Sequence, residues 1–220
     1  INPNIIVLGN RSYNFQFDKI LYDIGFKNIV PLEERKKIRL DLCRNIEIIR
    51  YPTTGIDNML LISSPEGKIL NYNDCNIPVY SQIRLKEKIG EIDLLLNNFN
   101  PAGKILQFPL LSEQEIKKDI KNKFYNTIDI FSPNYTIPFA SYHYFRAPES
   151  FNQNNFLINA DDLETDDYTI IPLNVRDTLI YDKESNKVEI NKIYNIKPTN
   201  YSIKIRTNSR VVALEVTLIC

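Results

Sequence analysis

The chain has 220 residues, and its 27 Lys and Arg balance 27 Asp and Glu, so the formal net charge is zero. This balance excludes a global electrostatic attraction to nucleic acid or to an anionic membrane. Hydrophobic residues make up 43% of the sequence, which favours a globular fold with a substantial core. The single histidine excludes a multi-histidine metal site built from these residues alone.

The first 160 residues alternate between patterns typical of strands and patterns typical of helices. Short apolar or alternating runs predict strands at residues 5–8, 46–51, 58–63, 68–72, 92–96 and 135–139. Helical spacing predicts one helix from Phe15 to Gly25 and another from Ser112, where Ser112 and Glu115 form a capping box. The charged segment 33–39 is typical of a solvated turn or hairpin face. This alternation predicts a layered α/β fold.

The pattern changes after residue 160. Acidic residues fill the segment 160–167, which is typical of a solvated linker, and their spacing matches no EF-hand calcium loop. Short β-like runs follow at 169–172, 178–181, 202–206 and 211–218. We therefore expect a first unit at 1–160 and a β-rich C-terminal extension at 161–220. The abundance of Asn, Ile and Lys is typical of an AT-rich genome, so single asparagines carry little information.

The cysteines are few and widely spaced, at Cys43, Cys75 and Cys220. They form no C-x-x-C motif, so the sequence supports neither a zinc knuckle nor a thioredoxin-type redox pair. Three thiols in a chain of this length indicate a reducing compartment, and the cytoplasm is the expected location. No apolar run approaches the ~20 residues needed to cross a bilayer.

The most distinctive stretch is Asn71-Tyr-Asn-Asp-Cys-Asn-Ile-Pro78, which places Asp74 directly after a predicted strand. Side chains at the carboxyl end of a strand project into the crevice where α/β proteins bind ligands. There an aspartate can act as a hard oxygen ligand for a metal or orient a nucleophile, with Asn73 as a companion. The alternative is an Asx-turn, since Asn and Asp before a proline often only end a strand.

The second candidate stretch, Ile137–Phe145, carries the only histidine at the end of another predicted strand. His143 could ligate a metal or act as a general base, because neutral imidazole serves both roles near pH 7. The alternative is a histidine packed among the neighbouring aromatic residues with one hydrogen bond satisfied. Ser141 lies close by, but no Gly-x-Ser-x-Gly motif marks it as a nucleophile.

A third stretch, Asn97–Gly103, follows the predicted strand 92–96 and so faces the same crevice. Gly103 permits a close approach of the backbone to a ligand. No glycine-rich phosphate-binding motif accompanies it, and an ordinary loop between strand and helix is the alternative.

Taken in order, these stretches resemble the second half of metallo-β-lactamase-fold proteins. The motifs are Asn71–Cys75, Ile92–Leu96 with Asn97–Gly103, Ile137–Ser141, Pro148-Glu-Ser and Asn155–Asn159. The branch they resemble most contains CMP-N-acetylneuraminate hydroxylase and related metallo-hydrolase-like proteins. The resemblance covers residues 4–160 and implies the C-terminal half of an αβ/βα sandwich.

The resemblance also implies a site. Asp74 matches the bridging metal ligand of the family, and His143 stands near Ala140, where many relatives carry their last histidine ligand. The His-x-His-x-Asp-His motif, which supplies most ligands in the family, is absent and would by position precede Ile1. We therefore expect a piece of a longer or split protein, completed by its own N-terminal segment or by a partner chain, or a fold that lost its metal.

If the site is completed, the resemblance implies a metal-dependent hydrolase or a related oxygenase with zinc or iron. A metal-activated water would attack a small-molecule substrate, with Asp74 and His143 at the metal. The pocket residues would be Asn73, Asn97, Asn98, Gly103 and Ser141. The alternative is a non-catalytic binding or assembly subunit that kept the fold and lost the metal site.

Overall fold

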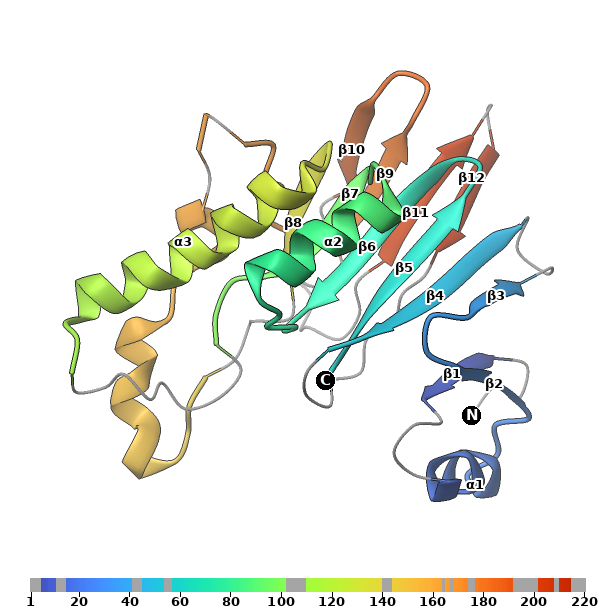
Figure 1. Cartoon of the computed structure of the whole chain (residues 1–220), viewed down its shortest axis with the longest axis horizontal. Coiled ribbons are helices and arrows are strands. Elements are labelled where there is room, and N and C mark those ends of the chain that lie inside the picture. Colours follow the sequence, from blue (N-terminus) through green and yellow to red (C-terminus); the bar gives the residue numbers. More distant parts are fainter. Residues whose placement is uncertain are drawn as a thin grey trace.

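The computed structural model of the chain describes residues 5–10, 15–40, 45–53, 57–101, 110–139, 144–163, 165–166, 168–173, 177–191, 202–207 and 210–214. Within these segments the strands form a six-stranded sheet, a four-stranded sheet and a two-stranded sheet (Figure 1). Helices pack on one face of the six-stranded sheet and the four-stranded sheet lies on the other face. The described residues are thus layered, as the sequence predicts.

The six-stranded sheet positions the candidate site. Its strands in spatial order are β3 (Lys37–Leu40), β4 (Ile46–Pro52), β5 (Asn58–Ser64), β6 (Gly67–Asn73), β7 (Leu94–Asn98) and β8 (Tyr135–Phe139). Neighbours from β3 to β6 are antiparallel, whereas β6, β7 and β8 are parallel. The predicted hairpin of β5 and β6 is confirmed. The segment predicted as a charged turn or hairpin face ends in an edge strand, β3, because its alternating residues pair with β4.

Helices α2 (Val79–Ile89) and α3 (Glu113–Phe131) cover one face of this sheet. Between them and the sheet lies a core of buried side chains that includes Leu61, Leu70, Tyr72, Leu85, Ile89, Leu95, Phe99, Phe124, Ile128 and Phe131. The predicted capping box is confirmed: the Ser112 hydroxyl accepts from the Glu115 backbone N–H, and the Glu115 carboxylate accepts from the Ser112 backbone N–H. No helix in the described segments is long and apolar enough to span a bilayer.

The opposite face packs against β9 (Thr178–Asp182) and β10 (Lys187–Asn191) of the four-stranded sheet, which continues with β11 (Ser202–Thr207) and β12 (Arg210–Leu214). Leu179 and Tyr181 of β9 share a core with Leu94 and Leu96 of β7. Because β7 is covered on both faces, three consecutive leucines, Leu94–Leu96, are at most 1% exposed. This explains why the sequence shows a continuous apolar run there rather than an alternation.

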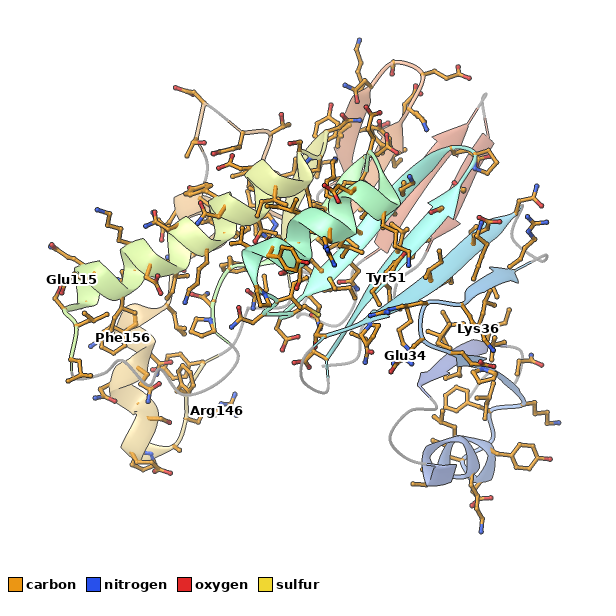
Figure 2. All side chains as sticks on the ribbon, in the orientation of Figure 1. Glu34, Lys36, Tyr51, Glu115, Arg146 and Phe156 are labelled. Atoms are coloured by element: carbon orange, nitrogen blue, oxygen red, sulfur yellow. The ribbon has the colours of Figure 1, made fainter. Side chains whose placement is uncertain are left out.

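The N-terminal elements form a small unit at the β3 and β4 end of the sheet (Figure 1). Strands β1 (Ile6–Asn10) and β2 (Asn28–Leu32) pair in parallel, with helix α1 (Phe15–Asp23) between them in the chain. Leu32 packs with Ile46 and Ile48 of β4. In Figure 2 Glu34 lies near the junction of this unit with the sheet, where its carboxylate faces the Arg50 guanidinium at 3.5 Å.

Two lysine side chains donate hydrogen bonds to carbonyl groups at the carboxyl ends of α2 and α3. The Lys68 ammonium donates to the Ile89 carbonyl at 2.7 Å, and the Lys86 ammonium donates to the Phe131 carbonyl at 2.5 Å. The last carbonyls of a helix have no partner within the helix and carry its partial negative charge. Each lysine therefore satisfies an open carbonyl and fixes one helix to a neighbouring element.

The chain after β8 returns along α3 through two 3₁₀ helices, η2 (Pro148–Phe156) and η3 (Ala160–Leu163). Phe156 packs against Ile116 beneath the first turns of α3 (Figure 2). The expectation of a solvated linker at 160–167 is wrong at its start, since Ala160 and Leu163 are buried in the helix-side core. Their small and apolar side chains face inward while the neighbouring acidic residues face solvent.

A buried polar network joins the two larger sheets. The Asp93 carboxylate accepts from the Tyr181 hydroxyl at 3.0 Å and from the Asn134 amide at 3.2 Å through Oδ1. Its other oxygen, Oδ2, accepts from the Lys68 backbone N–H at 2.8 Å. The Tyr181 hydroxyl also lies 3.2 Å from the Asn186 amide oxygen. Burial raises the pKa of Tyr181 to about 12, and the Asp93 carboxylate adds to the rise.

This raised pKa predicts an alkaline loss of stability. Between the ordinary tyrosine pKa near 10 and the folded value, the folded chain retains a proton that the unfolded chain releases, so the free energy of unfolding falls as the pH rises. Urea unfolding at a series of pH values from 9 to 12 should show that the free energy of unfolding falls less in a Tyr181→Phe variant than in the parent protein. Equal slopes in the two proteins would contradict the assignment to Tyr181.

Candidate functional site

The carboxyl ends of β6, β7 and β8 meet at one edge of the six-stranded sheet because the three strands are parallel. A bulge between Asn71 and Asn73 shifts the register of β6 against β7, and Asn73 has a left-handed φ of 51°. Asparagine tolerates this conformation better than most residues. The bulge ends the pairing with β7 and sends the chain into the Asp74 loop.

Asp74 is partly buried at this edge. Its Oδ1 atom is sealed from solvent and has no hydrogen-bond partner among the described residues. Asp57, just before β5, lies close enough to interact: burial raises the pKa of Asp57, and repulsion by the Asp74 carboxylate adds to the rise. Two carboxylates and one unsatisfied buried oxygen make this a place that favours a bound cation or a hydrogen-bond donor.

Cys75 follows in the same loop and is buried with a free thiol. Burial raises the pKa of its thiol to about 12, with further contributions from Asp57 and Asp74. The thiol is therefore protonated near neutral pH. A protonated thiol is a poor nucleophile and a poor metal ligand, so Cys75 packs as a small apolar residue.

A cavity of about 480 Å³ lies beside the Asp74 loop, between the ends of β6 and β7 and one side of α3. Its walls are formed by the loop 74–78 with the start of α2, by the segment 97–101 at the end of β7, and by α3 residues from Ile120 to Thr127. Its volume is in the range of small-molecule sites in proteins. The cavity therefore lies where the sequence predicted a ligand crevice.

The structure brings together some of the predicted site residues. Asp74, Asn97 and Asn98 line the cavity, whereas Asn73, although described, does not. Gly103, Ser141 and His143 lie outside the described residues. The proposed roles of these seven residues in metal or substrate binding stay predictions.

The two asparagines at the end of β7 have structural hydrogen bonds. The Asn97 amide, 2% exposed, donates to the Phe124 carbonyl at 3.1 Å and so fixes α3 to the sheet. The Asn98 amide donates to the Asn100 carbonyl at 2.8 Å within its own loop. Both side chains thereby shape the cavity wall.

Sequence reasoning missed the helical walls of the cavity. Gln82 of α2 and Lys123, Asn126 and Thr127 of α3 all line it. The spacing of Lys123, Asn126 and Thr127, three and four residues apart, is the signal of a shared helix face. No local pattern shows that this face meets the loops after β6 and β7, because only the packing of α3 on the sheet brings them together.

The described residues fit one ligand position of a metal site, not a whole site. Asp74 offers a carboxylate with an unsatisfied buried oxygen. Among the described residues, however, no three His, Cys, Asp or Glu side chains come together in a way that could hold a metal ion. A metal centre here would need further ligands beside Asp74.

No family profile and no curated protein matches the sequence. Among solved structures, CmlA, a diiron β-hydroxylase from Streptomyces venezuelae, is 17% identical with a TM-score of 0.50 over 76% of this chain and 38% of CmlA. YhfI from Bacillus subtilis, a metallo-β-lactamase fold protein, is 11% identical with a TM-score of 0.46 over 84% of this chain and 64% of YhfI. A metallo-β-lactamase superfamily protein from Thermotoga maritima is 14% identical with a TM-score of 0.42 over 94% and 87% of the two chains.

The predicted layered α/β fold is confirmed, and metallo-β-lactamase fold proteins are among the solved structures that resemble it, while the predicted branch within that superfamily is not confirmed. The chain spans 38% of the length of CmlA and 64% of that of YhfI. The likeness to CmlA, at 17% identity, concerns the fold and leaves the reaction open.

Proposed function

We propose that this chain contributes Asp74 to the metal site of a metallo-β-lactamase-fold enzyme and binds a small-molecule substrate in the adjoining cavity. The observation that carries the proposal is the buried Oδ1 atom of Asp74, which lacks a partner among the described residues at the carboxyl edge of parallel strands. A divalent cation would satisfy that oxygen and offset the repulsion between Asp57 and Asp74. His143 is the further ligand that we propose from this chain, and the others come from an N-terminal segment or a partner chain.

The class of reaction we propose is hydrolysis, because a divalent metal lowers the pKa of bound water and supplies a nucleophile at neutral pH. Oxygenation is the second candidate, since CmlA is a diiron β-hydroxylase. In either case the chain's own residues hold the substrate in the cavity and position it beside Asp74. Zinc in the full-length protein would support hydrolysis, and iron would support oxygenation.

Replacing the Asp74 carboxylate tests the proposal. The full-length protein should retain zinc or iron at close to one equivalent per chain after dialysis, measured by mass spectrometry of metals. An Asp74→Asn variant should bind the same metal at least about tenfold more weakly in a calorimetric titration, because the amide is a much weaker ligand than a carboxylate. The same change removes the repulsion of Asp57, whose pKa should fall toward its ordinary value.

The matched control is Asp161→Asn, which changes an exposed aspartate of η3 and should leave metal affinity unaltered. A full-length protein that retains no metal, or an Asp74→Asn variant that binds metal as tightly as the parent, would rule out the metal-dependent enzyme. A binding or assembly subunit would then be the better description.

A further inference from the structure

Gln82, one of the residues that line the cavity beside Asp74, has a side-chain oxygen without a hydrogen-bond partner among the described residues. The side chain is 8% exposed, and its Nε2 donates to the Ile77 carbonyl at 3.0 Å. The Oε1 atom is buried and has no hydrogen-bond partner among the described residues. The Ile77 carbonyl can only accept, so it fixes the orientation of the amide and leaves Oε1 as an acceptor without a donor.

The start of α2, in the same wall, offers backbone N–H donors that no side chain caps. Helix α2 begins after Pro78, whose side chain has no acceptor, so no side chain caps the helix, and its first turn holds no acidic residue. The cavity is lined by Asn76, Ile77, Pro78 and Val79 from this helix start. The first N–H groups of a helix favour a ligand that accepts hydrogen bonds.

The charges around the cavity disfavour an anion at that position. The Asp74 carboxylate belongs to the loop that leads into α2, and Asp74 lines the cavity together with the start of that helix. Among the described residues of the wall, Lys123 carries the positive charge, and its ammonium pairs with the Asp119 carboxylate at 2.9 Å. In the metal-free cavity an incoming anion would meet the acceptor oxygens of Asp74 and Gln82, whereas an uncharged group that donates a hydrogen bond would not incur that repulsion.

We infer that the cavity recognises an uncharged polar group that both donates and accepts hydrogen bonds, a primary carboxamide or a hydroxyl, with Gln82 Oε1 as the acceptor for its donor. The group's oxygen faces the start of α2, and its carbon body lies against the apolar part of the wall, formed by Tyr72, Ile77, Phe99, Ile120 and Phe124. The inference deepens the proposed function, because the same cavity is the substrate pocket in that proposal.

Three similar probes test the inference: benzamide, N,N-dimethylbenzamide and benzoate. Benzamide donates and accepts, the dimethyl amide only accepts, and benzoate has nearly the shape of benzamide with a negative charge. Titration of the full chain by ¹H–¹⁵N NMR should show benzamide binding about 5-fold or more tightly than either of the others, since a buried acceptor without a donor is costly. The shifts should centre on the first turn of α2 and on the Gln82 amide.

A Gln82→Met variant should lose the preference for benzamide, so that benzamide and the dimethyl amide bind about equally. The matched control is Gln114→Met, which makes the same change at an exposed position of α3 that does not line this cavity and should keep the preference. Urea unfolding of both variants measures how much stability is lost with the hydrogen bond from Gln82 to Ile77. That loss lowers the stability of the protein and does not change the ratio of the affinities for benzamide and the dimethyl amide.

Three outcomes would overturn the inference: no binding of benzamide up to its solubility, tighter binding of benzoate when the chelator is present, or a benzamide preference that survives Gln82→Met. The titrations are run with a chelator and again with added zinc. Failure of metal binding by Asp74 would remove the proposed enzyme and leave the benzamide preference intact, so the two failures are distinguishable.

Discussion

An Asp93→Ala variant should lose about 3–5 kcal/mol of its free energy of unfolding, a loss typical of a broken buried polar network. The carboxylate is 9% exposed and accepts from three donors on separate parts of the chain: the Lys68 backbone N–H, the Asn134 amide and the Tyr181 hydroxyl. Alanine leaves these donors without that acceptor. The Tyr181 hydroxyl can still reach the Asn186 amide oxygen, so the cost stays below the sum of three lost bonds. Urea unfolding measures the change.

Two further variants separate the parts of this network. Asp93→Asn keeps Oδ1 as an acceptor and should cost less than Asp93→Ala, while Tyr181→Phe removes a single hydroxyl and should cost about 1 kcal/mol. Asp161→Ala changes an exposed aspartate and should cost less than about 0.5 kcal/mol. An Asp93→Ala variant as stable as Asp161→Ala would show that the network does not hold the two sheets together.

The strands of the central sheet could be predicted because their signal is local. The hairpin of β5 and β6 follows from two apolar runs around a turn, and β8 has the predicted bounds, Tyr135–Phe139. The strand predicted at 92–96 begins two residues later, at Leu94. The predicted start was wrong because Asp93 is buried as a hydrogen-bond acceptor and does not belong to the strand.

Helix α2 was not predicted because its apolar residues do not mark its buried face. Val79, Tyr80 and Ile83 are exposed, while Gln82 is buried next to Leu85 and Ile89. A search for apolar residues three and four positions apart therefore finds no clear stripe at the start of this helix. The inverted pattern coincides with the cavity, since Val79 and Gln82 both line it.

The candidate site could be predicted only where it depends on strand ends. Asp74 follows β6 and Asn97 and Asn98 end β7, so parallel pairing alone brings them to one edge. The α3 wall, with Lys123 and Thr127, depends on packing across the sheet and leaves no local signal. The interpretation that single asparagines carry little information is wrong for Asn100, whose side chain joins segments 58 residues apart.

Asn100→Ala should destabilise the chain by about 2–4 kcal/mol, since two buried backbone groups lose their partners together. The side chain is 3% exposed; its Nδ2 donates to the Ile158 carbonyl and its Oδ1 accepts from the Ile158 N–H, both at 2.9 Å. The Asn100 side chain therefore pairs with the backbone of Ile158 as a neighbouring strand would. Ile158 follows η2 in the chain. Hydrogen exchange should accelerate most at the Ile158 N–H.

Asn154→Ala is the matched control, because Asn154 holds Phe145 through the same pair of bonds, 2.8 Å from the N–H and 2.9 Å to the carbonyl. This pair is only partly buried, so water can replace the lost partner, and the cost should be about 1 kcal/mol. The two asparagines share this pair of bonds and differ in burial, and the Asn154 amide also donates to the Phe151 carbonyl at 2.8 Å. Equal losses would show that the geometry of the bonds, and not exclusion of water, determines the loss of stability. Asn100 would then have no special role in fixing the segment that follows η2.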